Sequence, residues 1–338
     1  MRNFLLLFVF TALCAHAHAL AETPAVYHFI AKIPIEGEGG WDILHIDPAA
    51  RRLYLSHATK VIVVDLEKNA IVGEITDTPG VHAFVPVPEL QRGFSSNGKE
   101  NKSSVVDLKT LKTISKIETG ENPDAIAYDP KRGEIYVFNH TGKSATVIDA
   151  KTEKVVVTIP LGGSPEFPAV DVAAGHVYVN LEDKSEVAVI DAAKHEVTAH
   201  WPLAPGEEPT GIALDSAHHR LFTTCHNKIM EMLDTNSGKV LGHVPIGTGV
   251  DGCAFDEASQ LVFASCGEGM TVIAKENSPN ELSVAQTLPT QRGARTIALD
   301  PKTHRIYLPT ADFQPPATPN ARPAIVPNTM HLLVYGPQ

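Results

Sequence analysis

Short apolar runs alternate with turn residues along most of the chain. In one stretch the runs span residues 124–128, 134–138, 145–149 and 154–159, are rich in Val, Ile and Tyr, and are separated by short polar segments. Apolar runs of this length and composition are typical of β-strands, and the Gly, Asp, Asn and Pro residues between them indicate turns. The pattern therefore predicts an all-β protein built from short, consecutive strands.

This set of four strands recurs along the chain. Seven copies follow one another at intervals of about 40 to 44 residues, which is the period of four-stranded propeller blades. We therefore predict a seven-bladed β-propeller with four antiparallel strands in each blade. The clearest copies span residues 42–75, 82–117, 124–162 and 210–247, and weaker copies begin at Glu166, Asp251 and Arg295.

The last copy is incomplete, and this predicts how the ring closes. It offers strands at 295–299, 305–308 and 330–335 but no fourth, outer strand. The N-terminal segment 27–35 resembles the fourth strands of other copies and precedes the first blade. We expect it to complete the seventh blade and so remove two open sheet edges. Residues 22–338 would then form a single propeller domain, with a proline-rich insertion at 311–328 in the last blade.

Aspartates recur at two turn positions of the repeat. One follows the first strand, often as Asp-Pro, which favours a tight turn because Pro fixes φ and Asp can bond to its own backbone. The other ends the third strand in five copies, where we expect an Asx turn rather than a catalytic role. These five strand-ending residues are Asp65, Asp107, Asp149, Asp191 and Asp234.

Three local motifs resemble a known repeat. Tyr-Val-x-Asn at 136–139 is followed by Thr-Val-Ile-Asp at 146–149 and by Ile-Pro-Leu-Gly at 159–162. This pattern resembles the YVTN-type β-propeller repeat, and the whole arrangement is similar to the YncE-like exported bacterial propellers. The resemblance covers essentially all of the predicted mature chain. It implies a secreted propeller scaffold, and it brings no catalytic signature.

The first residues predict export. An apolar run from Phe4 to Ala15 follows a basic N-terminus, and Ala19-Leu20-Ala21 has the small residues of a cleavage site. Residues 1–21 therefore look like a signal peptide that is cleaved after Ala21, which places the mature protein in the periplasm or outside the cell. No other stretch is long and apolar enough to span a membrane. We expect a protein without a membrane span, and a monomer.

The charge balance makes some partners less favourable than others. Acidic residues outnumber basic ones by 39 to 28, which disfavours binding to double-stranded nucleic acid. A small-molecule, ion or exported protein partner fits this surface better. A local patch of Lys60, Lys99, Lys102 and Lys143 leaves single-stranded nucleic acid or a cell-wall polymer as a less favoured alternative.

Polar residues at the start of the innermost strands are the best candidates for a site. We expect these positions to form a ring at the mouth of the central channel. A ring of solvated polar groups, a divalent metal site and a pocket for a small polar ligand are three interpretations. The metal interpretation would use Asp124, Glu166, His82 and Asp251, and the ligand interpretation would use Arg295 for an acidic group. The ring positions are Asp42, His82, Asp124, Glu166, Thr210, Asp251 and Arg295.

A second ring is expected where the second strands end. Asparagines there favour turn capping, and Cys225 and Cys266 occupy equivalent places in neighbouring blades, so that a soft-metal site or a disulfide is an alternative. Cys253 is expected in the core. The second-ring candidates are His57, Asn97, Asn139, His140, Cys225, His226 and Cys266, and Asn180 and Thr310 fall at the same repeat position.

These observations favour a binding protein over an enzyme. The sequence has no phosphate-binding glycine loop, nucleophile elbow, zinc-helix motif or haem attachment pair. We expect an exported, non-catalytic scaffold that binds its partner at the central-channel face, with the loop at 311–328 as a lid, a partner-docking loop or a solvated insertion. The alternative is a metal-dependent hydrolase or lyase, similar to lactonases of this fold, which would use carboxylates at the channel mouth.

Overall fold

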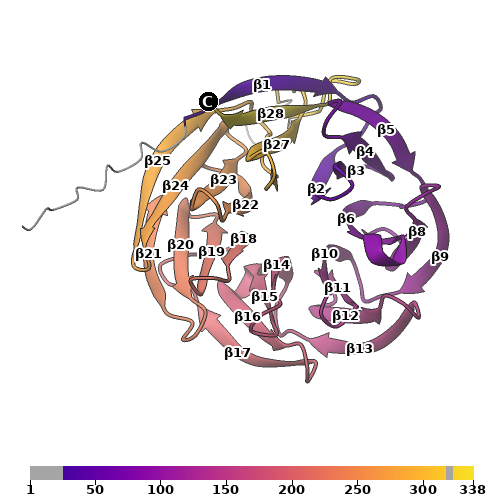
Figure 1. Ribbon diagram of the computed structural model, residues 1–338, viewed down its shortest axis with the longest axis horizontal. Helices are drawn as coiled ribbons and strands as arrows, with labels where there is room; N and C mark the ends of the chain where they lie inside the picture. Colours follow the sequence, from indigo (N-terminus) through magenta and orange to yellow (C-terminus); the bar gives the residue numbers. More distant parts are fainter. Residues whose placement is uncertain (1–25, 317–322) are drawn as a thin grey trace, which may run out of the picture.

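Seven four-stranded antiparallel sheets arranged around a central axis make up the fold (Figure 1). The computed structural model describes residues 26–316 and 323–338. The expected signal peptide at 1–21 lies outside the described residues. Each of the first six blades is one repeat of the sequence, with its first strand beside the axis and its last strand at the rim, and the seventh combines the last repeat with the N-terminal strand. The predicted seven-bladed β-propeller is therefore confirmed.

The strands follow one another in chain order within each of the first six blades. Two short 3-10 helices, η1 (Pro88–Leu90) and η2 (Glu182–Lys184), lie in connections. Blades one to four are β2 (Trp41–Asp47), β3 (Arg52–His57), β4 (Lys60–Asp65), β5 (Ala70–Ile75); β6 (Val81–Val87), β7 (Arg92–Asn97), β8 (Lys102–Asp107), β9 (Lys112–Glu118); β10 (Pro123–Asp129), β11 (Glu134–Asn139), β12 (Ser144–Asp149), β13 (Lys154–Pro160); and β14 (Pro165–Asp171), β15 (His176–Leu181), β16 (Glu186–Asp191), β17 (Glu196–Pro202). Blades five to seven are β18 (Pro209–Asp215), β19 (Arg220–Cys225), β20 (Ile229–Asp234), β21 (Val240–Pro245); β22 (Val250–Asp256), β23 (Leu261–Cys266), β24 (Met270–Ser278), β25 (Glu281–Pro289); and β26 (Ala298–Asp300), β27 (Arg305–Thr310), β28 (His331–Pro337), β1 (Tyr27–Pro34).

The core lies between the faces of neighbouring blades. In blade three, the second and third strands β11 and β12 are buried almost throughout and have mostly apolar sequences, whereas the outer strand β13 has mostly exposed residues. An aromatic ring occupies the third position of every second strand and is at most 1 % exposed. Large rings at one repeated position fill the wedge between adjacent blades. These residues are Tyr54, Phe94, Tyr136, Tyr178, Phe222, Phe263 and Tyr307.

The strand-ending aspartates form the expected Asx turns. The carboxylate of Asp149 accepts backbone hydrogen bonds from Lys151 and Thr152 at 3.0 and 2.7 Å. Asp65, Asp107 and Asp191 accept the same pair of bonds from the residues two and three positions later. These bonds hold the turn into the outer strand. The repeated aspartates are therefore structural.

The N-terminal strand closes the ring, as predicted. β1 pairs antiparallel with β28, in a register from Tyr27 opposite Pro337 to Pro34 opposite His331. The two ends of the described chain therefore lie side by side in the seventh blade (Figure 1). Because β1 supplies the outer strand, β28 has hydrogen-bonded neighbours on both sides.

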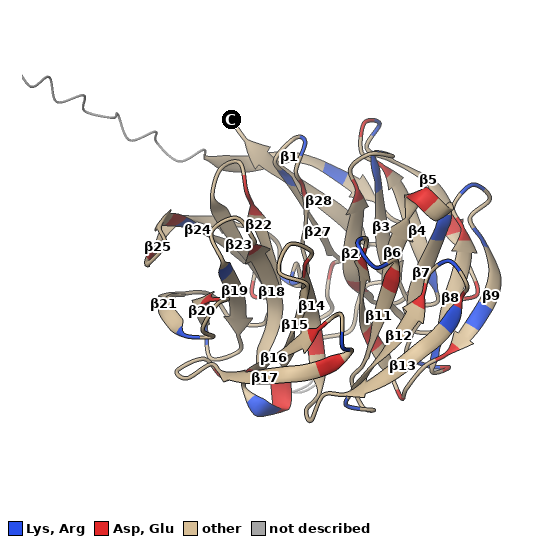
Figure 2. Cartoon of the chain, turned by 60° about the horizontal axis from the view of Figure 1, so that its bottom comes forward, with Lys and Arg blue, Asp and Glu red and all other residues tan. Residues whose placement is uncertain are grey.

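Charges of both signs are interspersed over the outer strands and loops (Figure 2). Three of the four lysines in the candidate polymer-binding patch are paired with acidic residues: Lys60 with Glu74, Lys102 with Glu118 and Lys143 with Asp183, at 2.6, 3.0 and 2.7 Å. Pairing within the surface lowers the charge available to a polyanion. Within residues 26–316 and 323–338, no helix has the length and apolar character needed to cross a membrane.

Candidate functional site

The repeat brings the predicted ring residues to one end of the channel. Six of them occupy the second position of an innermost strand, directly after a buried first residue, as Asp42 follows Trp41 in β2 and His82 follows Val81 in β6. Arg295 lies three residues before β26. The innermost strands all begin at the same end of the channel, because every blade is built in the same order. We call this end the channel mouth.

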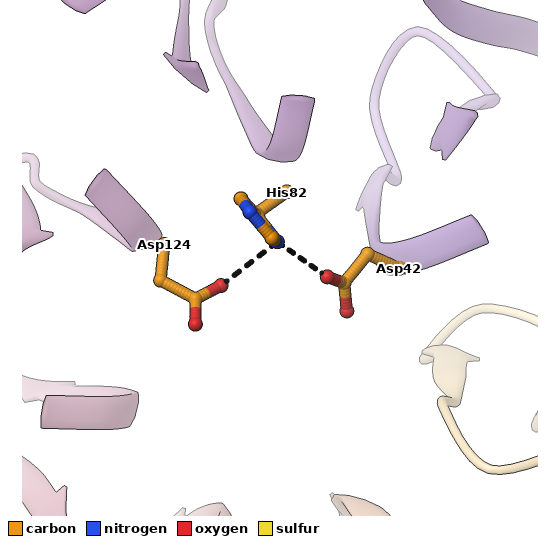
Figure 3. A group of neighbouring side chains, drawn as sticks. All are labelled: Asp42, His82 and Asp124. Atoms are coloured by element: carbon orange, nitrogen blue, oxygen red, sulfur yellow. Dashed lines mark hydrogen bonds and ion pairs between the residues drawn. The ribbon is translucent and has the colours of Figure 1, made fainter. Parts of the chain in front are cut away.

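Ion pairs link the ring residues across blades. The Nδ1 atom of His82 lies 2.7 Å from Asp42 Oδ2 and 3.3 Å from Asp124 Oδ1, so one imidazole bridges two carboxylates from the blades on either side (Figure 3). On the other side of the mouth, Arg295 donates through Nε to Asp251 Oδ2 at 2.6 Å. Thr210, which carries no charge, is buried and donates to the carbonyl of Val250.

The carboxyl groups crowd one another. Burial raises the pKa of Asp124, and the charges of Asp42 and Glu166 raise it further, despite the nearby imidazoles. Burial also raises the pKa of Asp251, against the opposing effect of Arg295. For His82, burial lowers the pKa, but the hydrogen bond to Asp42 and the charge of Asp124 outweigh it and raise the value. The mouth therefore favours bound protons and other cations.

His140 joins this ring although it belongs to the second ring of the sequence analysis. Its Nδ1 atom lies 2.9 Å from Glu166 Oε1. The hydrogen bond to Glu166 raises the pKa of His140 to about 9, while burial acts in the opposite direction. Because the folded-state pKa is raised, this pair stabilises the fold fully below the unfolded-state pKa of about 6.5, and the contribution is lost as pH rises through about 9.

We expect a proton NMR titration of the His140 ring to show a midpoint near 9 in the unmodified protein. Glu166→Gln should move this midpoint down towards about 6.5, because the neutral amide no longer favours the imidazolium ion. Glu186→Gln, which removes a carboxylate from β16 that faces His200 instead, is the control and should leave it in place. An unchanged midpoint in Glu166→Gln would contradict the pairing.

Two groups of ring residues have the composition of a metal site. Asp42, His82 and Asp124 form one, and Asp124, His140 and Glu166 form the other; in each, the potential ligand atoms lie within 4.8 Å of one another. Asp124 belongs to both groups. Asp251, which was predicted as a possible metal ligand, is paired with Arg295 and lies in neither group, whereas His140 belongs to the second group.

A cavity of about 650 Å³ opens on the other half of the mouth. Its wall contains Glu166, Asp251 and Arg295 from the predicted ring. It also contains two charged residues that sequence reasoning missed, Glu182 from η2 and Arg292 from the segment before β26. Both lie in connections between strands, where the repeat gives no register. The only sequence signal for Glu182 and Arg292 was that each is a charged residue in a short connection between strands.

The proline-rich insertion reaches this cavity through Phe313 and Pro323. Phe313 packs against Trp41 with ring centroids 6.2 Å apart, and its backbone forms a β-bridge with Ile325. Trp41 in turn lies beside the Arg295 guanidinium, whose Cζ atom is 6.0 Å from the indole centroid. The described residues of the insertion are thus anchored on the same face as the ring.

Most of the second ring does not reach the mouth. Its residues are fully buried and bond to neighbouring strands: Asn139 Nδ2 donates to the hydroxyls of Ser144 and Thr146, and Asn180 Nδ2 donates to the carbonyls of Thr210 and Gly211. Asn139 and Asn180 therefore link strands, whereas Asn97 also donates to Glu100 within its own turn. Only His140 and His226 of this set contribute to the mouth. The buried members are His57, Asn97, Asn139, Asn180, Cys225, Cys266 and Thr310.

The three cysteines in the described part of the chain form no disulfide. Cys225, Cys253 and Cys266 are all free thiols, so the alternative of a disulfide between Cys225 and Cys266 is wrong. Burial raises the pKa of the Cys266 thiol to about 11 and raises that of Cys225 as well. Such thiols are protonated at neutral pH.

Deeper in the channel the lining is mostly apolar. A second cavity of about 450 Å³ is bounded by side chains from the middle of the innermost strands, including Ile43, Val85, Phe167 and Ile297. Cys253 also lines it and is half-buried, rather than being a core residue. The charged side chains of the ring therefore lie at the channel mouth, whereas the side chains deeper in the channel are mostly apolar.

The fold and the site together define a class, a seven-bladed β-propeller with a charged channel mouth. No family model matches the chain, and no curated protein sequence matches it. Among solved structures, it is similar to the one named Kuenenia stuttgartiensis Hydrazine Synthase, with a TM-score of 0.69 and 16 % sequence identity over 81 % of this chain and 94 % of that chain. At this identity, the similarity supports the propeller fold alone.

Proposed function

We propose that the protein is an exported, non-catalytic β-propeller of the YVTN-repeat, YncE-like kind, which binds a small polar ligand at the channel mouth. The ligand would carry an acidic group and an amine or hydroxyl group. The observation that carries this proposal is the charge distribution in one cavity of about 650 Å³, where Arg292 and Arg295 share a wall with Glu166 and Glu182. Cavities of this size are typical of small-molecule sites.

Arg292 is the group best suited to an acidic ligand. Arg295 is engaged by Asp251, whereas Arg292 is exposed and has no ion-pair partner within the described part of the chain. A guanidinium group can bind a carboxylate through two parallel hydrogen bonds. The ligand's acidic group would therefore lie at Arg292, and not at Arg295 as the sequence suggested.

Glu182 and Glu166 would receive the amine or hydroxyl group. Burial raises the pKa of Glu182, and the charge of Glu166 raises it further, because the two carboxyls repel each other when both are ionised. His226 offsets this only weakly, with Nδ1 at 3.8 Å from Glu182. A ligand amine between the carboxyls would remove the repulsion, which favours a zwitterionic ligand.

Ligand binding at Arg292 can be tested with amino acids and hydroxycarboxylic acids as probes, screened by thermal shift and then measured by isothermal titration calorimetry. We expect at least one probe to bind and Arg292→Gln to weaken it by about tenfold or more, because a charged hydrogen-bonded pair contributes about 1.5–3 kcal/mol. Lys184→Gln, in the same connection as Glu182 but exposed, is the control. The proposal fails if no probe binds, or if Arg292→Gln binds as the unmodified protein does.

A metal-dependent hydrolase or lyase is the second candidate, favoured by the two carboxylate–imidazole groups that share Asp124. Carboxylates and imidazole suit a hard or borderline divalent ion, which would polarise a carbonyl or activate water. Elemental analysis of protein purified from its own host without chelators tests this. A stoichiometric metal that is lost in Asp124→Ala with Glu166→Ala would support the enzyme. Metal-free protein would exclude it.

A further inference from the structure

A second cluster of ionisable side chains lies at the opposite end of the blades from the channel mouth. Asp215 ends β18, whereas the ring residue Thr210 lies near the start of the same strand. His218 follows in the turn, with Nδ1 at 2.6 Å from Asp215 Oδ2. Glu276 reaches the cluster from β24 of the next blade, and one ligand atom from each of the three residues lies within 4.8 Å of the others. The cluster therefore bridges blades five and six.

Glu276 departs from the repeat at this point. Its backbone N–H donates to the carbonyl of Gln260, and the residue after the third strand makes the same bond in five other blades. In those blades the side chain is apolar or a threonine, which suits its position beneath the turn. A carboxyl group here is not required by the fold. The equivalent residues are Leu66, Leu108, Ala150, Ala192 and Thr235.

The Glu276 side chain is buried and incompletely bonded. The residue is 6 % exposed, and its Oε2 atom has no hydrogen-bond partner within the described residues. Burial raises the pKa of Glu276, and the charge of Asp215 raises it further. A buried carboxyl oxygen without a partner costs free energy, so an additional partner at this position would be stabilising.

At two of the other blade boundaries, the equivalent aspartate pairs with a basic side chain of the next blade. Asp300 pairs with Arg51 at 2.7 Å, and Asp256 pairs with the imidazole of His304 at 2.9 Å. Asp215 instead meets a second carboxyl, that of Glu276. This boundary therefore has an excess of negative charge.

The nearest arginine does not supply the missing cation. The charge of Arg220 lowers the pKa of Glu276, but this is the smallest of the effects on that pKa. Its guanidinium is engaged elsewhere, donating to the carbonyls of Pro279 and His219 and lying 3.2 Å from Asp234 Oδ1. The imidazole of His218 is the remaining basic group, and it already bonds to Asp215.

We propose that Asp215, His218 and Glu276 form a binding site for a borderline divalent metal ion such as Zn²⁺, which joins blades five and six. Two carboxylates and one imidazole are ligands that zinc accepts, and three protein ligands leave a position for water. The His218 side chain is 51 % exposed, so the site has access to solvent. The metal takes the place that Arg51 and His304 have at the boundaries where they pair with Asp300 and Asp256. The site is separate from the channel mouth and does not depend on the function proposed there.

The test uses the full mature chain after removal of metals with a chelator. Co²⁺, as a spectroscopic substitute for Zn²⁺, should bind with visible absorption bands of low-symmetry coordination, and Zn²⁺ should raise the melting temperature. We expect Glu276→Gln and His218→Ala each to weaken Co²⁺ binding by tenfold or more, as loss of a ligand does. His218 is exposed, so this variant leaves the buried packing intact.

Asp124→Asn is the matched control, because it alters both metal-like groups at the channel mouth and leaves this cluster intact. It should retain the Co²⁺ bands. The proposal is overturned if the unmodified protein binds neither Co²⁺ nor Zn²⁺, which would leave a proton shared between the two carboxyls. It is equally overturned if both variants at the cluster bind as well as the unmodified protein, or if Asp124→Asn alone loses the bands.

Discussion

Removal of the N-terminal strand is expected to prevent stable folding. A chain that begins at Glu36 lacks β1 and Ile35. It therefore loses the side chains of Tyr27, Ile33 and Ile35, which are only 1–4 % exposed in the full chain. Burial of three such side chains contributes roughly 4–9 kcal/mol, which is comparable with the whole stability of a typical domain. Loss of β1 also leaves β28 as an open edge. We expect aggregation in size-exclusion chromatography and no cooperative thermal transition by circular dichroism.

A single substitution in β1 gives a graded form of the same test. Ile33→Ala should lower the free energy of unfolding by about 2–5 kcal/mol, because it leaves a cavity between the seventh and first blades. The neighbouring Lys32 is exposed, and Lys32→Ala should change the free energy of unfolding by no more than about 0.5 kcal/mol. A synthetic peptide of residues 26–36 should restore solubility to the truncated chain by adding back the strand. A truncated chain that melts like the full chain would show that β1 does not hold the ring closed.

The propeller could be predicted from the sequence because its physical signals are local and repeated. Runs such as 134–138 and 145–149 needed only strand propensity and turn residues, and the observed β11 and β12 differ from them by one residue at one end. The closing strand was predicted because the last copy lacked an outer member. Repetition averages out errors at any one blade, so the number of strands in each blade and their order were both predictable.

The partners within the site were less predictable. Position in the repeat placed Asp42, His82 and Asp124 at one end of the channel, but which imidazole meets which carboxylate depends on side-chain rotamers and blade spacing. Asn139 shows the other limit: strand ends lie near the mouth, yet its side chain points into the packed space between strands. Arg292 lies in a connection, where repeat counting has no register.

Blades one and seven are also joined by an ion pair, which Arg51 forms with Asp300. Two parallel hydrogen bonds of 2.7 Å join the guanidinium to the carboxylate, whose side chain is fully buried. Burial raises the pKa of Asp300, but the hydrogen bonds from Arg51 and Thr303 outweigh this and lower it. Because the folded-state pKa is lowered, the pair stabilises the fold above the unfolded-state pKa of about 3.9, and this contribution is lost as pH falls through the folded-state value.

Arg51→Ala should therefore lower the free energy of unfolding at pH 7 by about 3–5 kcal/mol, because it leaves a buried carboxylate without its counter-ion. The deficit should narrow in urea titrations below about pH 4, where protonation of Asp300 removes the unpaired charge. The free energy of unfolding of Arg51→Lys should lie between those of the unmodified protein and of Arg51→Ala, since an ammonium group cannot form the parallel pair of bonds. Lys194→Ala removes an exposed partner of Asp191 and should change the stability by no more than about 0.5 kcal/mol. An Arg51→Ala variant as stable as Lys194→Ala would mean that β1 alone, rather than strand and ion pair together, closes the propeller.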